Sequence, residues 1–406
     1  HFPLFPLDPQ ISNYCPSFLV LLRVKGLLGR NHTRHLSPTM AVYRLRIFII
    51  AAAIATSLLL LFGAYSQNVI TPQNVSDLTK NIAAHVPGTG SGSSTSKTGN
   101  GVSSSSSSGK KNAYMTLLTN TMDAPEDPAQ DHYFMATRIL GYQLLHQPNT
   151  RTQRGYPFVV LVTADVKQDR RDLLTSDGAI VLPVQNLEYN ATRINGEMPQ
   201  WKDVMTKLRA WELVEYDLIA FLDGDFILNR CLDGIFDDGA TMPATLLTSN
   251  TLPTDEGELP STYVLATVAE ANPFHNYPPT AAAHDYKDPN YFNAGFFLFR
   301  PDLTLFHHFE KILQLEGRFD PQYPEQNLLN YAFRRAGQMP WIEMDGNWHI
   351  RFPTVGDMEQ GVASMHDKWW SAHMDKGLQP YYDSIRWRME GFYEVTSKKQ
   401  WELAFE

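Results

Sequence analysis

The chain has 406 residues, of which 43% are hydrophobic and 12% aromatic. This composition supports a packed core in one large domain or two ordinary ones. The formal net charge of −9 argues against a nucleic-acid-binding protein. Most of the chain is acidic, whereas residues 1–46 carry a clear excess of basic side chains.

The first recognisable element is residues 47–65, an uncharged run long enough to cross a bilayer as a helix. Arg44 and Arg46 precede this run. The positive-inside rule therefore predicts a signal-anchor with a cytoplasmic N-terminus and a lumenal remainder. A cleaved signal peptide is the alternative, because a small-x-small site follows at 64–66. Either interpretation exports the rest of the chain.

The composition divides the chain around this run. Residues 1–46 are predicted to be a cytoplasmic tail, and one interpretation of residues 1–39, which precede Met40, is an upstream extension of the gene prediction. Residues 66–111 are rich in serine and glycine and are predicted to form a flexible stem. The remaining residues, 112–406, are predicted to form a single catalytic domain.

The predicted domain alternates near-continuous apolar strands with helices. This alternation is typical of an α/β fold with a parallel sheet covered on both faces. The aromatic-rich segment 375–406 is expected to pack against that sheet. Strands are predicted at 114–118, 157–163, 178–184, 218–222, 242–248 and 292–299, and helices at 132–145, 171–174 and 203–214.

The most informative segment is the apolar strand 218–222, which runs directly into Asp223-Gly224-Asp225. Two carboxylates at the end of a buried strand are costly unless a cation meets them. The carboxyl end of a strand is also where open α/β sheets bind ligands. The pattern therefore predicts a divalent-metal site for a phosphate-bearing substrate. For the triplet alone, a solvated turn is the other interpretation.

Three later segments carry polar residues beside apolar runs. Residues 291–301 place an asparagine and an Ala-Gly pair at the start of a strand, where glycine permits close backbone approach. Residues 324–330 form a polar helix start, which is either a helix cap or a functional feature. Residues 364–370 set a histidine and a lysine beside two tryptophans.

Taken in this order, the segments resemble the family 8 retaining glycosyltransferases, the group of glycogenin and galactinol synthase. The resemblance covers roughly residues 112–371. It rests on AYMTLLTN, MTKLRAWELVEYDLIAFLDGDFIL, YFNAGFFLFRPDL, PEQNLLNYAF and MHDKWW. It implies a nucleotide-diphospho-sugar transferase (GT-A) fold, in which helices flank a Rossmann-like mixed sheet.

The same resemblance implies an activity and a location. The implied enzyme takes a UDP-sugar donor, uses Mn²⁺ (with Mg²⁺ as an alternative), and glycosylates a glycan or glycoprotein. Together with the anchor and stem, it predicts a single-pass type II protein of the Golgi membrane with a lumenal catalytic domain.

The resemblance also implies roles for individual residues. Asp223, Asp225 and His366 match the metal ligands. The match gives Leu117, Thr119, Asn120 and Tyr133 to the uridine and Lys368 to the β-phosphate. It gives Lys207, Asn293, Glu325 and Gln326 to the donor sugar and the catalytic face. Gly224 has no side chain, which predicts close approach of the donor to the backbone.

Two departures from the family pattern affect these roles. Glu325 stands where the family usually has the shorter aspartate. His366 and Lys368 are two residues apart, whereas animal glycogenin-type sequences have a longer glycine-containing loop. The short ending resembles a fungal branch that includes a Golgi N-acetylglucosaminyltransferase type.

The implied reaction retains the configuration of the sugar. No isolated carboxylate stands out as a nucleophile, so we favour attack from the leaving-group face over a covalent intermediate. A haloacid-dehalogenase-like phosphatase also has Asp-x-Asp after a strand, but that motif normally opens its domain. A catalytically inactive sugar-nucleotide-binding module is the non-enzyme alternative, and it would be expected to lose a metal ligand.

Overall fold

The computed structural model describes residues 111–119, 125–189, 203–248, 250 and 253–403. The predicted tail, the anchor at 47–65, nearly all of the stem and Asn120 lie outside these ranges. Within the described ranges, none of the helices is both long enough and apolar enough to cross a bilayer.

The main sheet runs through the centre of the fold. Its strands are β1 (Asn112–Leu118), β2 (Phe158–Val162), β3 (Ile180–Pro183), β4 (Leu218–Leu222), β8 (Leu265–Thr267), β9 (Phe296–Phe299) and β10 (Ile342–Glu343). Their order across the sheet is β10-β8-β9-β4-β1-β2-β3. Strands β4, β1, β2 and β3 are parallel, whereas β9 is antiparallel to both of its neighbours.

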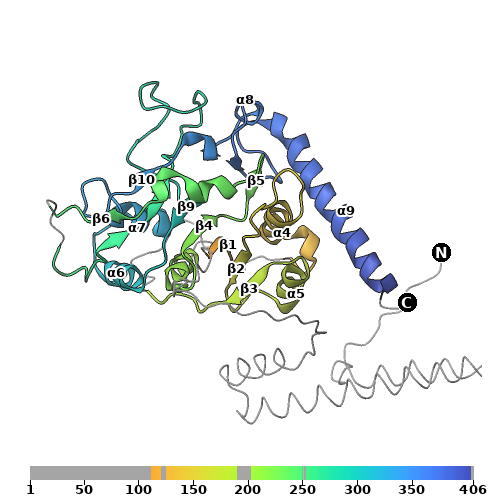
Figure 1. The fold of residues 1–406 in the computed structure, drawn as a ribbon, viewed down its shortest axis with the longest axis horizontal. Helices are drawn as coiled ribbons and strands as arrows, with labels where there is room; N and C mark the ends of the chain where they lie inside the picture. The colour runs from red at the N-terminus through yellow and green to blue at the C-terminus, as the bar shows by residue number, and fades with distance from the viewer. Residues whose placement is uncertain (1–110, 120–124, 190–202, 249, 251–252, 404–406) are drawn as a thin grey trace, which may run out of the picture. The chain divides into compact units, whose positions relative to one another are not determined.

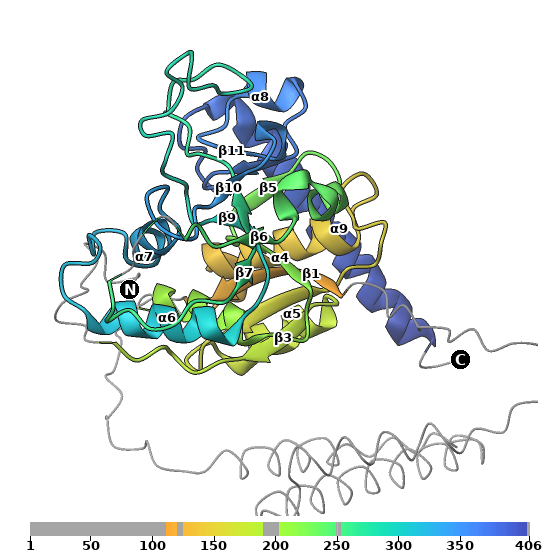
Figure 2. The same cartoon turned by 60° about the vertical axis from the view of Figure 1, so that its left-hand side comes forward.

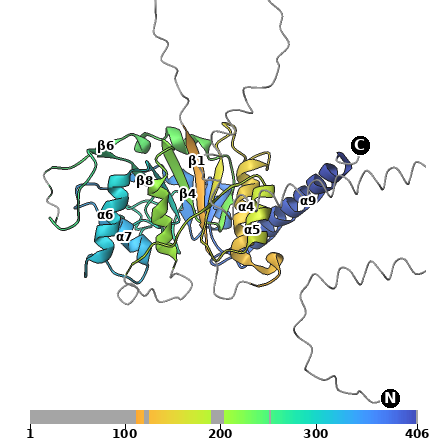
Figure 3. The same ribbon diagram turned by 90° about the horizontal axis from the view of Figure 1, so that it is seen from below.

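Helices cover both faces of this sheet. They are α4 (His132–Leu145), α5 (Gln168–Ser176), α6 (Leu303–Gln314), α7 (Pro324–Ala332), α8 (Val355–Glu359) and α9 (Gln379–Leu403). The 3₁₀ helices are η1 (Pro128–Gln130), η3 (Val204–Glu212), η4 (Asp233–Asp237), η5 (Gly239–Thr241), η6 (Gly346–Trp348) and η7 (Lys376–Leu378). Figure 3 shows α6 and α7 on one side of the sheet and α4, α5 and α9 on the other.

Alternating side chains of the central strands pack into two separate hydrophobic cores, one on each face of the sheet. On β1, Tyr114 belongs to the core under α4, while Ala113 and Met115 belong to the core under α6. On β4, Ala220 and Phe221 divide in the same way. Because both faces are dry, every residue of β4 is apolar and buried.

A smaller sheet sits beside the main one. It contains β5 (Phe226–Leu228), β11 (His349–Arg351) and β12 (Ser364–His366), in the order β11-β12-β5. Strand β12 is parallel to β11 and antiparallel to β5. Figure 2 shows β11 and α8 above the main sheet. Strands β6 (Ala244–Thr245) and β7 (Thr262–Tyr263) form a separate two-stranded ribbon.

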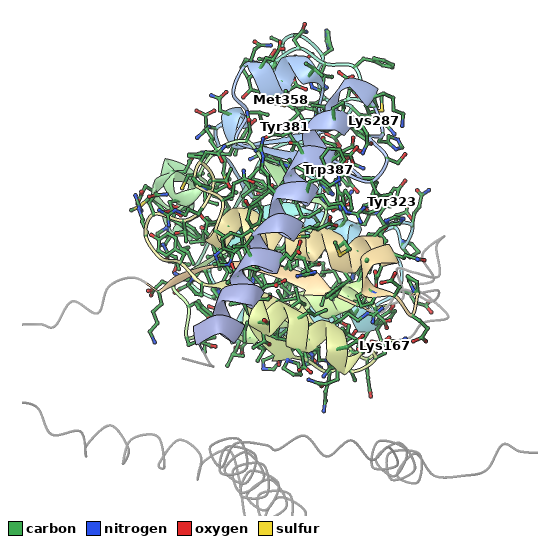
Figure 4. All side chains as sticks on the ribbon, turned by 90° about the vertical axis from the view of Figure 1, so that its right-hand side faces the viewer. Lys167, Lys287, Tyr323, Met358, Tyr381 and Trp387 are labelled. Carbon is green, nitrogen blue, oxygen red and sulfur yellow. The ribbon has the colours of Figure 1, made fainter. Side chains whose placement is uncertain are left out.

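The C-terminal helix α9 runs diagonally past α4 (Figure 1). The Phe392 ring stacks on the His146 ring with centroids 4.7 Å apart. The Tyr381 hydroxyl donates a hydrogen bond to the Leu228 carbonyl of β5 at 3.3 Å. Trp387 is 66% exposed, and Figure 4 shows it on the outward side of the helix. The aromatic segment thus packs mainly on α4 and the small sheet.

Several sequence expectations need correction. The predicted strand 242–248 shrinks to β6, outside the main sheet. The predicted helix 203–214 is the 3₁₀ helix η3. The sheet is mixed, because β9 reverses direction, and it is not the parallel sheet that the alternation alone predicted. An apolar strand buried on both faces carries no mark of its direction, which is why the pattern missed the reversal.

Candidate active site

A cavity of about 830 Å³ opens at the carboxyl ends of β1 and β4, next to the edge of the small sheet. It falls within the size range of ordinary ligand pockets. All predicted site residues within the described ranges line it. They are Leu117, Thr119, Tyr133, Lys207, Asp223, Gly224, Asp225, Asn293, Glu325, Gln326, His366 and Lys368.

The three predicted metal ligands come together at this cavity. One ligand atom from each of Asp223, Asp225 and His366 lies within 4.8 Å of the others. Asp223 follows β4, Asp225 precedes β5, and His366 ends β12. The His366 Nε2 atom lies 3.2 Å from an Asp225 oxygen, while its buried Nδ1 has no hydrogen-bond partner among the described residues.

The Asp225 carboxylate is almost fully buried between two basic side chains. One oxygen faces His366, and the other accepts a hydrogen bond from the Lys368 ammonium. Burial alone would raise the pKa of Asp225, but the charges of Lys368 and His366 outweigh it and hold that pKa well below its usual range. The carboxylate therefore stays anionic and can bind a cation.

Lys207, on η3, lies beneath the other carboxylate. Its buried ammonium donates to Asp223 at 3.0 Å, to the Ala294 carbonyl at 2.9 Å and to Glu325 at 3.3 Å. Burial tends to lower the pKa of Lys207, but Asp223 and Glu325 together raise it. All three ammonium donors thus have protein acceptors. The predicted contact between Lys207 and the donor stays a prediction.

The amide side chains Asn293 and Gln326 form a connected wall of the cavity. Asn293 donates to Glu270 at 3.1 Å and accepts from the Gly295 N–H at 2.9 Å. Gln326 donates to the Tyr291 hydroxyl at 2.6 Å. The residue that caps α7 makes no side-chain cap bond. The cap of α7 is Tyr323, outside the segment 324–330, and the functional interpretation of this polar helix start stays a prediction.

Two glycines make room for this geometry. A Cβ added at Gly224 would lie 2.9 Å from the Thr137 hydroxyl oxygen, so close packing on α4 already explains the glycine. A Cβ at Gly295 would overlap the His366 ring and lie 2.8 Å from an Asp223 oxygen. Gly295 thus leaves the space that two candidate ligands occupy. The sequence had predicted only that this glycine permits close approach to the backbone.

An aromatic group borders the other side of Lys368. Its ammonium lies 5.1 Å from the Tyr133 ring centre and 5.5 Å from the Trp370 ring centre. The Trp370 ring stacks on His132, with centroids 5.1 Å apart. The sequence had singled out Tyr133 alone. The two adjacent tryptophans of MHDKWW could have indicated that Trp370 also lies beside Lys368.

Other cavity residues had no motif to reveal them. Arg351 ends β11 and Phe352 follows it, while Glu270 and Lys287 come from the long connection between β8 and β9. These residues belong to segments whose sequence shows no periodic pattern, so only the fold brings them to the site.

Comparisons with known proteins show the family of the chain. Residues 129–368, more than half of the chain, match the family described as Glycosyl transferase family 8. An uncharacterized protein of Schizosaccharomyces pombe is 30% identical over 293 residues, which cover 64% of this chain and 74% of that protein. Galactinol synthase 2 of Arabidopsis thaliana is 25% identical, covering 66% of this chain and 83% of its own.

Among solved structures, the glycosyltransferase GlyE of Streptococcus pneumoniae TIGR4 is similar, with 14% identity and a TM-score of 0.40. The match covers 71% of this chain and 64% of that one. The family match goes further, and the chain belongs to glycosyl transferase family 8. Enzymes of this class move a sugar from a donor to an acceptor. The family therefore favours glycosyl transfer over the phosphatase alternative.

Proposed function

We propose that the chain is a metal-dependent retaining glycosyltransferase that takes a hexosyl or N-acetylhexosaminyl unit from a UDP-sugar. The acceptor is a glycan or a glycoprotein. The observation that carries the proposal is the convergence of Asp223, Asp225 and His366 at one cavity, from segments far apart in sequence.

The donor atoms at this site suit a hard divalent ion. Carboxylate oxygens with one imidazole nitrogen are ligands for Mn²⁺ and also accept Mg²⁺. The buried, unpartnered Nδ1 of His366 and the anionic state of Asp225 both fit such an ion. When bound, the ion would supply Lewis-acid stabilisation of the departing diphosphate.

The chain's own residues divide the remaining work. Leu117, Thr119 and Tyr133 border the part of the cavity assigned to the uridine. Lys368 offers a cation to the β-phosphate, where fixed charge stabilises the leaving group.

Asn293, Glu325 and Gln326 form the wall assigned to the transferred sugar. Glu325 is held by Lys207, which directs its carboxylate away from the role of a free nucleophile. That contact favours same-face attack by the acceptor hydroxyl over a covalent intermediate.

The cellular setting is part of the same proposal. A signal-anchor at 47–65 and a stem at 66–111 would place residues 112–406 in the lumen of the Golgi as a type II membrane protein. The short His366-to-Lys368 spacing further suggests the fungal N-acetylglucosaminyltransferase type.

A donor panel tests the activity. The purified full chain is incubated with Mn²⁺ and UDP-glucose, UDP-galactose, UDP-N-acetylglucosamine or UDP-xylose, and UDP release is measured. At least one donor is expected to release UDP, and chelation by EDTA is expected to stop it. Asp225→Asn keeps the shape but removes the charge, and should lower turnover by about 10²- to 10³-fold.

The outcomes separate the alternatives. UDP bound with Mn²⁺ but never released from any donor would indicate the inactive binding module. Release of inorganic phosphate from an added phosphate monoester such as p-nitrophenyl phosphate, with no UDP released from any donor, would indicate the phosphatase. Undiminished activity of Asp225→Asn would refute the metal assignment.

A further inference from the structure

The basic side chains that line the cavity differ in how their charge is balanced. Lys207 is bonded to Asp223 and Glu325, and Lys368 is bonded to Asp225. Arg351 lines the same cavity, but no described carboxylate lies within ion-pair distance of it. Its charge is therefore not balanced by any part of the chain that the structure describes.

The small sheet places Arg351 beside the candidate metal ligands. Arg351 ends β11 and pairs with His366, which ends β12. His366 pairs in turn with Phe226, the first residue of β5, directly after Asp225. Neighbouring strands lie about 4.8 Å apart. Asp225, His366 and Arg351 thus lie at the same end of the small sheet, on or next to three neighbouring strands.

The contacts of the Arg351 side chain leave donors available. One Nη donates to the His366 carbonyl at 3.0 Å, which is a neutral acceptor. The buried Nε has no hydrogen-bond partner among the described residues. The guanidinium lies 4.2 Å from the centre of the Phe352 ring, which lines the cavity with it. Phe352 has φ +63°, a costly conformation for a bulky residue, so its backbone is held in place by the surrounding structure.

A partly buried guanidinium without an anionic partner is destabilising unless something else supplies the anion. At the rim of a cavity, a ligand can supply it. The planar fork of an arginine fits phosphate oxygens with two parallel hydrogen bonds, whereas a lysine acts as a point charge.

We propose that Arg351 binds the diphosphate of the donor, as a second cation beside Lys368. The ligand class is a nucleoside diphosphate or its sugar ester. This proposal rests on the proposed function, because it assumes that the donor lies in this cavity. It assigns to the small sheet both a candidate metal ligand and a phosphate-binding side chain.

Binding measurements on the full chain can test this role. Arg351→Gln removes the charge but keeps an N–H donor for the His366 carbonyl. Affinities for UDP and for uridine are measured by calorimetry with Mn²⁺ present. UDP binding should weaken by about 10- to 100-fold, the range for a charge-assisted hydrogen bond, and uridine binding should change by less than about twofold.

Two matched measurements separate phosphate binding from other effects. Lys311→Met removes a positive charge from an exposed position on α6 that does not line the cavity, and it should change UDP affinity by less than about threefold. Arg351→Gln should bind Mn²⁺ without nucleotide as well as the wild type does. If Arg351 only supported His366, the Mn²⁺ affinity would fall instead. Arg351→Lys, which keeps a charge, should recover part of the UDP affinity, and it serves if the glutamine variant does not fold.

The results distinguish this proposal from the proposed function. A wild-type chain that does not bind UDP with Mn²⁺ would overturn both. If the wild type binds UDP but Arg351→Gln binds it equally well, or loses uridine as strongly as UDP, only the role of Arg351 is overturned. Arg351→Lys binding UDP no better than Arg351→Gln would also contradict a contact based on charge.

Discussion

The two halves of the candidate site are built differently. On the main-sheet side, Asp223 and Glu325 share the buried ammonium of Lys207, and their bonds are made within the protein. On the small-sheet side, buried nitrogens of His366 and Arg351 have no partner among the described residues. The charges of Lys207 and Glu325 in the first half are balanced within the protein, whereas the second half keeps buried nitrogens that a ligand can bond.

This difference indicates which part of the site responds to ligands. A self-sufficient charge cluster contributes to stability and positions its carboxylates in advance. A half with unpaired buried groups gains most when an ion or a phosphate arrives. We therefore expect loss of Lys207 to change mainly folding, and loss of a basic side chain of the small-sheet half to change mainly binding.

The largest effect that joins both halves is expected at Gly295. Gly295→Ala places a methyl group against the His366 ring and near Asp223, which must move apart. A misplacement of about 1 Å can lower the rate by about 10²-fold. UDP release measures the effect. Gly239→Ala is the control, because nothing lies within 4 Å of the added carbon there. Equal activity of both variants would contradict the crowding argument.

Lys207→Met tests the self-sufficient half. The variant leaves Asp223 and Glu325 without their shared cation. The side chain of Asp223 is about a third exposed, and that of Glu325 is largely buried. Removing one partner of a buried pair costs about 3–5 kcal/mol, and the exposure of Asp223 favours the lower end. Urea unfolding measures the loss. If stability is unchanged, the two halves do not differ as described.

Lys368→Met tests the small-sheet half of the site. Without nucleotide, this variant should strengthen metal binding. The Lys368 ammonium bonds Asp225, so it competes with a metal ion for that carboxylate. Without UDP, the variant should bind Mn²⁺ about tenfold tighter, because a like charge is removed from the site. With UDP present, the gain should vanish as a phosphate contact is lost. Weaker Mn²⁺ binding by the nucleotide-free variant would be the contrary result.

The smallest effect is expected at His275, which does not line the cavity. This residue of the β8–β9 connection bonds Asp357 of α8 at 3.2 Å and the Asn272 carbonyl at 2.7 Å. Burial lowers the pKa of His275, but these two bonds raise it above its ordinary value. A raised pKa means that protonated His275 stabilises the fold below about pH 6.5, and that this contribution is lost as pH rises through the folded pKa.

The expected difference in unfolding free energy between wild type and His275→Gln is about 1 kcal/mol near pH 6 and shrinks toward pH 9. Urea unfolding across this range measures it. His307→Gln is the matched control, because His307 pairs with Glu310 on an exposed helix surface. A difference that grows with pH would reverse the assigned sign.

Local patterns predicted much of the fold. The helix 132–145 and the strand 218–222 are confirmed with the same bounds, since each has a strong apolar pattern. Asp131 also marks the start of that helix, where its carboxylate accepts the Phe134 N–H. The predicted metal ligands lie together, as a family motif would require.

Features that depend on distant segments were not predictable. The charge balance of Lys207 depends on Glu325, which is 118 residues away. The position of Arg351 depends on a three-residue strand pairing with another of the same length. Such short strands have no periodicity to read, and their pairing is set by the packing around them.

The small sheet also sets the order in which the site can form. Lys368 and Asp225 are 143 residues apart, and β5 and β12 must meet before the site exists. Closing so long a loop is slow, so this pairing is expected to follow the β1–β2 pairing, in which Tyr114 and Phe158 are 44 residues apart. During synthesis, the aspartates emerge long before their partners, and a nascent chain could hold neither metal nor nucleotide until strand β12 has been made.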